Sequence, residues 1–120
     1  RDYIHICDLA RAHTLALQYL EQSKNKKPCE VFNLGSGEGV TVLEAIRAFE
    51  KVSGQQLNYV TGPRRPGDVV AVYANNQLAK DVLGWIPKYS IEDIMDSAWK
   101  WELRLKADAT VFGSIPGELN

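Results

Sequence analysis

The feature that most constrains the fold is an apolar run that ends in closely spaced glycines and leads directly into a strong helix start. Residues 31–34 (Val-Phe-Asn-Leu) have the short apolar character of a buried strand. Glycines follow at alternate positions: Gly35, Gly37 and Gly39. Thr41 can cap a helix, Glu44 completes a capping box, and Gly54 offers a left-handed stop. The sequence therefore predicts a strand, a tight turn and a helix over residues 31–54.

A first helix is predicted to begin at about Asp8, because apolar residues recur there at three- and four-residue steps. The residues expected on its buried face are Leu9, Ala12, Ala16, Leu17 and Leu20. His13 lies among these apolar positions and is expected to be a partly buried structural histidine. His5, before the helix, is expected to pack or hydrogen-bond locally rather than bind a metal, since no second pair with metal-ligand spacing exists.

The second half of the chain repeats the alternation of strand and helix. Residues 57–60 are a predicted strand, and residues 69–74 are a predicted extended segment. A short helix is expected to end before Gly84, and Ser90 with Asp93 caps a last helix. This alternation predicts an α/β fold. Residues 1–106 are expected to form one folded region, followed by an irregular tail over residues 107–120.

Composition excludes several classes of function. The 120 residues carry a formal net charge of −1, which gives no electrostatic reason to bind nucleic acid or an anionic membrane. No apolar run approaches the roughly 20 residues of a membrane-spanning helix. Cys7 and Cys29 have no close-spaced pattern, which favours a reducing cytoplasm over a disulfide scaffold, although their pairing in the fold stays open.

Two neighbouring arginines stand in a loop stiffened by prolines, Gly62-Pro63-Arg64-Arg65-Pro66-Gly67-Asp68. A guanidinium presents a planar fork of donors that matches phosphate or carboxylate, and prolines reduce the entropy lost when a loop becomes ordered. The following aspartate can accept from paired hydroxyls such as those of a ribose. The loop thus indicates a phosphorylated sugar or nucleotide as ligand, against the alternative of a solvated surface turn.

Two further motifs accompany this loop: residues 1–9 (Arg-Asp-Tyr-Ile-His-Ile-Cys-Asp-Leu) and residues 33–37 (Asn-Leu-Gly-Ser-Gly). In order and spacing, the three segments resemble the C-terminal part of the UDP-glucose 4-epimerases, which are extended short-chain dehydrogenase/reductases. The resemblance runs from residue 1 to about residue 105. It implies a small substrate-binding lobe without the Rossmann domain, so the chain, which begins with arginine, is expected to be a piece of a longer protein.

The resemblance also implies roles for individual residues. Arg1 and Arg65 would hold the UDP diphosphate, Asp68 would bind the uridine ribose, and Arg64 has a weaker claim. Val72 would border the sugar pocket, where a residue smaller than tyrosine leaves room for an N-acetyl group. The implied partners are a UDP-sugar, the N-terminal Rossmann domain that carries NAD, and a second subunit of a homodimer.

The chain itself lacks the residues that the reaction of this family needs. Its glycines are spaced G-x-G-x-G, with Val40 where the dinucleotide fingerprint requires a third glycine. No tyrosine is followed four residues later by the lysine of the family's catalytic pair. We therefore expect no cofactor site, no catalytic residue and no activity in this chain alone. The alternatives are another nucleotide-sugar enzyme of the same superfamily (a dehydratase, decarboxylase or different epimerase) and a free-standing, non-catalytic binding module.

Overall fold

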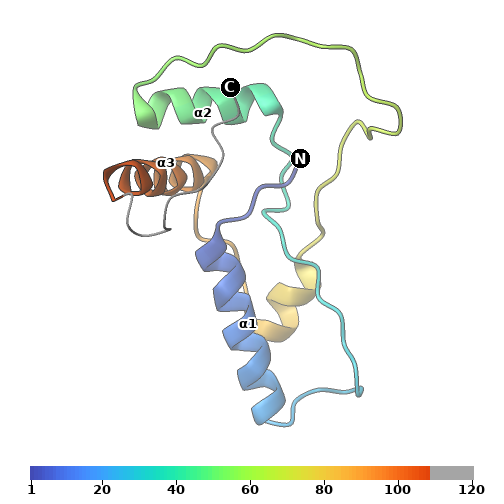
Figure 1. Cartoon of the computed structure of the whole chain (residues 1–120). Helices are drawn as coiled ribbons and strands as arrows, with labels where there is room; N and C mark the ends of the chain where they lie inside the picture. Colours follow the sequence, from blue (N-terminus) through green and yellow to red (C-terminus); the bar gives the residue numbers. More distant parts are fainter. Residues whose placement is uncertain (109–120) are drawn as a thin grey trace, which may run out of the picture.

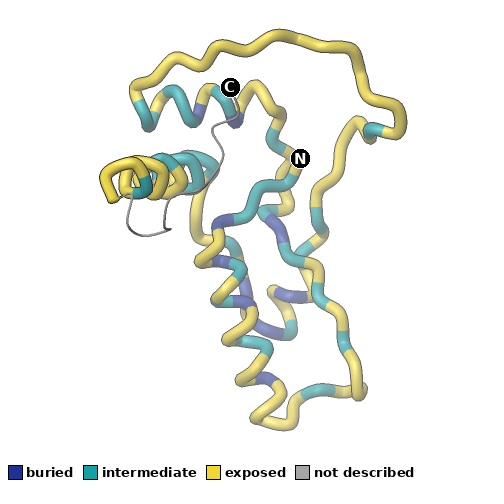
Figure 2. Tube along the Cα trace, viewed as in Figure 1, coloured by how far each residue is buried: buried dark blue, intermediate teal, exposed yellow. Residues whose placement is uncertain are grey.

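The structure is a computed structural model that describes residues 1–108, and these residues form helices joined by extended segments (Figure 1). In chain order the helices are α1 (Ile6–Glu21), α2 (Val42–Ser53), a π-helical turn η1 (Ala79–Leu83) and α3 (Ile91–Ala107). α1 packs with η1, and α2 packs with α3. An exposed arm of residues 54–70 leaves the end of α2 and returns toward η1 (Figures 1 and 2).

α1 begins at Ile6, two residues before the predicted start, because His5 caps it. Nδ1 of His5 accepts a hydrogen bond from the Cys7 backbone N–H at 3.1 Å, which confirms that this histidine bonds locally. His13 is exposed, and its Nδ1 donates to the Leu9 carbonyl one turn back. The prediction of a partly buried His13 was therefore wrong, because its position faces away from η1.

The core lies where α1 meets η1 and the segment after it (Figure 2). Its buried residues are Ala12, Tyr19, Ala79, Leu83 and Trp85. The Trp85 side chain is fully buried, and its Nε1 donates to the Asp8 carbonyl at 2.8 Å. Small residues on α1 allow this close approach. The predicted inner positions Leu17 and Leu20 are instead more than half exposed, since η1 covers only part of the apolar stripe.

The capping predictions for α2 and α3 are confirmed. Thr41 with Glu44 and Ser90 with Asp93 both form complete capping boxes, in which side chain and backbone bond reciprocally. Gly54 ends α2 in the left-handed conformation, with φ at 67°.

The packed faces of α2 and α3 meet through Phe49 and Trp99, whose rings lie edge to face at 5.5 Å between centroids. Ala45 and Ala48 are buried on α2, while Val42 is 62% exposed. Lys51 on α2 also pairs with Glu92 on α3 at 2.6 Å, so an aromatic pair and an ion pair join the two helices.

The strand predictions were wrong for the described residues, since residues 31–34 and 57–60 form no ladder. A strand needs a neighbouring backbone to exchange hydrogen bonds with, and the arm has none alongside it: Val60 and Val70 are more than 90% exposed. The radius of gyration is 18.5 Å, against about 14 Å for a compact domain of this length. The α/β class is therefore not confirmed within residues 1–108.

Within the part of the chain that the structure describes, no helix is both long and apolar enough to cross a membrane. α3 ends at Ala107, so most of the predicted irregular tail, residues 109–120, lies outside the described residues.

Candidate functional site

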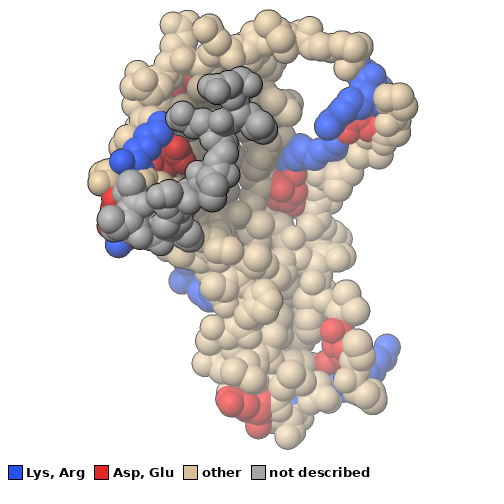
Figure 3. Space-filling model, viewed as in Figure 1, with Lys and Arg blue, Asp and Glu red and all other residues tan. Residues whose placement is uncertain are grey.

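An open cavity of about 740 Å³ lies between the N-terminal residues, the glycine loop and the arm. Its walls include all four residues that the sequence analysis singled out: Arg1, Arg65, Asp68 and Val72. Figure 3 shows basic and acidic side chains gathered beside the opening between the arm and the rest of the molecule. The volume falls in the usual range of small-molecule sites. Three segments far apart in sequence thus converge on one site.

Arg1 is fixed at both its backbone and its side chain. Its backbone nitrogen donates to the Val40 carbonyl at 2.7 Å, and its carbonyl accepts from the Val40 N–H at 2.8 Å. Its guanidinium donates to Oδ1 of Asp68 at 2.5 Å and to the Val69 carbonyl at 3.3 Å. These side-chain contacts use two of the five N–H donors of an arginine. The Arg1 guanidinium therefore lies in the wall of the cavity and retains donors for an anion.

The arginine loop closes on Asp68. Nη2 of Arg65 lies 3.8 Å from Oδ2 of Asp68, and the Arg65 side chain is 83% exposed. Arg64 donates to the Asp68 carbonyl at 2.6 Å and does not line the cavity. The structure thus brings Arg1 and Arg65 to the same carboxylate. Val72 follows on the same wall and is half exposed.

Asp2, which sequence reasoning passed over, joins three segments of the site. Its Oδ1 accepts from the Ser36 N–H at 2.8 Å and from the Ser36 hydroxyl at 2.6 Å, and its Oδ2 accepts from the Ala74 N–H at 2.8 Å. Partial burial by itself would raise the pKa of Asp2, but these hydrogen bonds outweigh it and lower the pKa below its ordinary value. Asp2 is therefore an ionised acceptor between the glycine loop and residue 74.

The glycine loop is shaped around that carboxylate. A Cβ on Gly35 would overlap Oδ2 of Asp2 and stand 2.8 Å from the Ala74 Cβ. Gly37 has a φ of 79°, in the left-handed region, and the Asn76 side chain donates to the Gly35 carbonyl at 2.8 Å. The glycines thus permit close approach to protein groups. The donors at Ser36 are already engaged by Asp2, so this loop does not fit a dinucleotide pyrophosphate.

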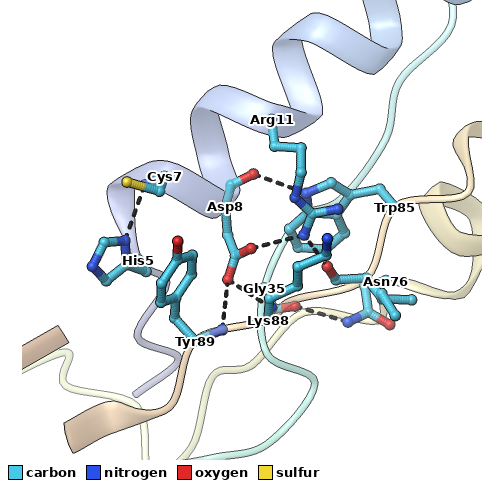
Figure 4. Close-up of polar contacts among 10 residues, drawn as sticks. His5, Cys7, Asp8, Arg11, Gly35, Asn76, Trp85, Lys88 and Tyr89 are labelled. Atoms are coloured by element: carbon cyan, nitrogen blue, oxygen red, sulfur yellow. Dashed lines mark hydrogen bonds and ion pairs between the residues drawn. The ribbon is translucent and has the colours of Figure 1, made fainter. Parts of the chain in front are cut away.

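A second carboxylate, Asp8, lies in the first turn of α1, outside the cavity (Figure 4). It is fully buried, and its oxygens accept from Arg11 at 2.8 Å and from the backbone N–H groups of Lys88 and Tyr89 at 2.9 and 3.1 Å. Burial would raise the pKa of Asp8, but the hydrogen bonds from Arg11 and from these amides lower it overall. Asp8 therefore ties the first turn of α1 to the segment that leads into α3.

His5 also contacts the segment that leads into α3, and α3 itself. Its ring stacks on Tyr89 at 4.2 Å between centroids, and its Nε2 lies 3.1 Å from the Ser97 hydroxyl on α3. The signal for both aspartates was present in the sequence: each is an acid beside an apolar run, a position where a carboxylate is retained only if donors satisfy it.

The remaining candidate residues are not at the cavity. Cys7 and Cys29 are exposed and unpaired, so the open question of a bond between them is answered for this structure. Trp85 fills the core and Trp99 packs between α2 and α3.

No family model matches the chain, but individual proteins do. It is 48% identical over 101 residues to the UDP-glucose 4-epimerase GEPI42 of Cyamopsis tetragonoloba, covering 84% of this chain and 28% of that protein. It is 44% identical over 102 residues to the UDP-glucose 4-epimerase of Lacticaseibacillus casei, covering 84% of this chain and 30% of that protein. The chain thus spans less than a third of the length of these curated relatives.

Solved structures give the same result. A UDP-glucose 4-epimerase from Stenotrophomonas maltophila, with bound NAD and formylated UDP-arabinopyranose, superposes with a TM-score of 0.83 at 39% identity, covering 89% of this chain and 31% of that one. The UDP-Glc/GlcNAc 4-epimerase of Campylobacter jejuni gives a TM-score of 0.75 at 38% identity, covering 87% and 31%. The predicted resemblance to UDP-glucose 4-epimerases is confirmed in sequence and in fold.

Proposed function

We propose that this chain is the UDP-sugar-binding part of a UDP-glucose 4-epimerase, which interconverts UDP-glucose and UDP-galactose. The observation that carries the proposal is the convergence of Arg1, Arg65 and Asp68 on one open cavity of about 740 Å³. The comparisons support it, because proteins named for this activity are 44–48% identical to the chain over 84% of its length.

In this proposal the two guanidinium groups bind the diphosphate. Arg1 lies in the wall, and Arg65, whose side chain is 83% exposed on its loop, binds the anion from the other side. In the ligand-free structure Asp68 stands between them as the internal counter-ion. A diphosphate takes over this neutralising role, and Asp68 is then available to accept from the ribose hydroxyls.

The separation of nucleotide binding from hydride transfer fits the chemistry of an epimerase. NAD, when bound by the rest of the complete protein, accepts and returns a hydride at C4 of the sugar. This chain binds the nucleotide away from C4, which leaves the hexose free to present either face to the hydride donor. Arginines that bind phosphate bidentately supply such a grip. We propose that an N-terminal nucleotide-binding domain completes the site, that the complete protein is a homodimer, and that this chain alone binds substrate without turnover.

Val72 bears on which sugar is accepted. It lines the same cavity as the arginines and is 53% exposed. Valine is much smaller than tyrosine, so we propose that the pocket also admits UDP-N-acetylhexosamines.

The test is turnover by the complete gene product loaded with NAD, comparing UDP-galactose with UDP-N-acetylgalactosamine. Formation of the matching glucose epimer from UDP-galactose is expected, with comparable turnover of the acetylated sugar. A folded, NAD-loaded protein that epimerises neither sugar would contradict the proposal. Loss of water or carbon dioxide from a nucleotide sugar would instead identify a dehydratase or decarboxylase, and binding without any turnover would identify a non-catalytic module.

A further inference from the structure

We propose that Asp2 is a positioning residue for the cavity, acting with Arg1 to hold both ends of the wall formed by residues 68–74. The inference rests on the proposed function, since it assigns Asp2 a part in UDP-sugar affinity. Asp2 does not line the 740 Å³ cavity, so it would act through residues that do.

Arg1 and Asp2 are consecutive residues that hold opposite ends of this wall. Arg1 donates to Asp68 and to the Val69 carbonyl, at one end of the wall. Asp2 accepts from the Ala74 N–H, at the other end. Neighbouring residues of an extended chain point to opposite sides, so one dipeptide reaches both ends. Val72 lies between the two contacts, and its position in the cavity follows from both.

Asp2 also holds the opposite wall of the cavity, which the glycine loop forms. The other oxygen of Asp2 accepts from the N–H and the hydroxyl of Ser36. The Ser36 hydroxyl oxygen in turn accepts from the Glu38 N–H at 3.1 Å, which shapes the turn. Gly37, Glu38 and Gly39 line the cavity. A single carboxylate therefore ties both walls to the backbone of Arg1, whose own position is fixed by the pair of hydrogen bonds to Val40.

The hydrogen-bond partners of Asp2 require a carboxylate at this position. Asp2 faces only donors, so both of its oxygens must be acceptors. Asparagine has the same shape but presents an NH₂ group in place of one oxygen, and that group would face an N–H donor. The lowered pKa of Asp2 agrees with this requirement for a carboxylate. Asp2→Asn therefore releases one wall of the cavity while changing almost no volume.

The experiment uses the complete gene product loaded with NAD and measures the Kd for UDP by calorimetry, well below the unfolding temperature of each variant. Asp2→Asn is expected to raise this Kd at least tenfold, and to raise KM for UDP-galactose with little change in kcat, as loss of uniform binding does. Asp8→Asn is the matched control: it removes the charge from a carboxylate that also holds two backbone amides, but away from the cavity. Its Kd for UDP is expected to stay within threefold.

A double-mutant cycle tests whether Asp2 acts together with Arg1 on the same wall. In an Arg1→Ala background, one end of the wall is already released, so Asp2→Asn is expected to raise the Kd less than twofold further, as residues that share one network are non-additive. Fully additive effects, or an unchanged Kd in Asp2→Asn alone, would overturn the inference and leave the proposed function standing. An unchanged Kd in Arg1→Ala would count against the proposed function itself.

Should Asp2→Asn fail to fold, Ser36→Ala provides the second variant. It keeps the carboxylate and removes one of its three donors. A three- to tenfold rise in the Kd for UDP is expected, again with no change in the Asp8→Asn control. An unchanged Kd in the folded Ser36→Ala protein would overturn the proposal.

Discussion

Oδ2 of Asp2 lies in the space that a side chain at Gly35 would occupy. The contact explains why the apolar run of residues 31–34 is followed immediately by a glycine. The glycine is needed for approach to a protein carboxylate, not to a bound phosphate. Two motifs that stand more than 30 residues apart are therefore one structural unit, which supports the wall of the cavity.

Gly35→Ala should destabilise the protein. The added methyl group would displace the Asp2 carboxylate or the Ala74 backbone, and overpacking of this kind costs about 1–3 kcal/mol. The control is Gly62→Ala, since a Cβ there meets nothing within 4 Å, and its effect should stay within about 0.5 kcal/mol. Denaturant unfolding of both variants measures the difference, and equal shifts would contradict the close contact.

Asp8→Asn should destabilise the protein more than most substitutions. It removes the charge that the partly buried Arg11 is paired with and places an NH₂ group against the amides of Lys88 or Tyr89. Breaking a buried pair in this way costs roughly 3 kcal/mol. The fall in the denaturation midpoint checks the value. A midpoint that matches the parent would show that these contacts do not hold α1 to the segment before α3.

Stability should fall steadily in acid. The pKa values of Asp2 and Asp8 are lowered in the folded protein, so each contributes stability that is fully present above the ordinary pKa of 3.8. That stability is lost as the pH falls through the lower, folded values. Unfolding free energies measured from about pH 6 to about pH 2.5 should show this decline. The decline should be shallower in Asp8→Asn, which lacks one of the two groups; an unchanged slope would refute its contribution.

Arg65→Ala should weaken UDP binding by at least tenfold, or about 1.4 kcal/mol, because the diphosphate loses one of its two guanidinium partners. Arg64→Ala is the neighbouring control. Arg64 is bonded to the Asp68 carbonyl and does not line the cavity, so its effect should stay below threefold. Calorimetric titration with UDP compares the two. A larger loss in Arg64→Ala would reverse the assignment.

Val72→Tyr should narrow the range of sugars. The phenol ring would fill part of the cavity that Val72 lines, so turnover of UDP-N-acetylgalactosamine should fall at least tenfold relative to UDP-galactose. The ratio of the two kcat/KM values is the measurement, because it cancels any general loss of activity. An unchanged ratio would remove Val72 from the pocket that receives the N-acetyl group.

Local signals in the sequence were reliable because they involve residues three or four positions apart. The Thr41–Glu44 and Ser90–Asp93 capping boxes and the stop at Gly54 depend on their own turns of helix, and the structure confirms all three. The structure also brings Arg1, Arg65, Asp68 and Val72 to one cavity. Their roles toward a ligand remain predictions.

Long-range features could not be predicted in the same way. Residues 57–60 alternate as a strand does, but alternation does not supply the neighbouring backbone that makes a ladder. Leu17 and Leu20 lie on the apolar stripe of α1, yet the short turn η1 does not extend far enough to cover them. Asp2 and Asp8 each stand beside an apolar run, but the sequence does not identify their backbone donors, which come from residues 34 to 81 positions away.

Because residues 68–74 are attached at both ends, the number of residues in this wall is fixed. Its two ends are set by adjacent residues, Arg1 and Asp2, so a single inserted or deleted residue between the two contacts would turn every following side chain to the opposite side. Residues 58–61 of the arm, by contrast, are exposed throughout. Natural length variation should therefore be tolerated before the arginine loop and excluded after it.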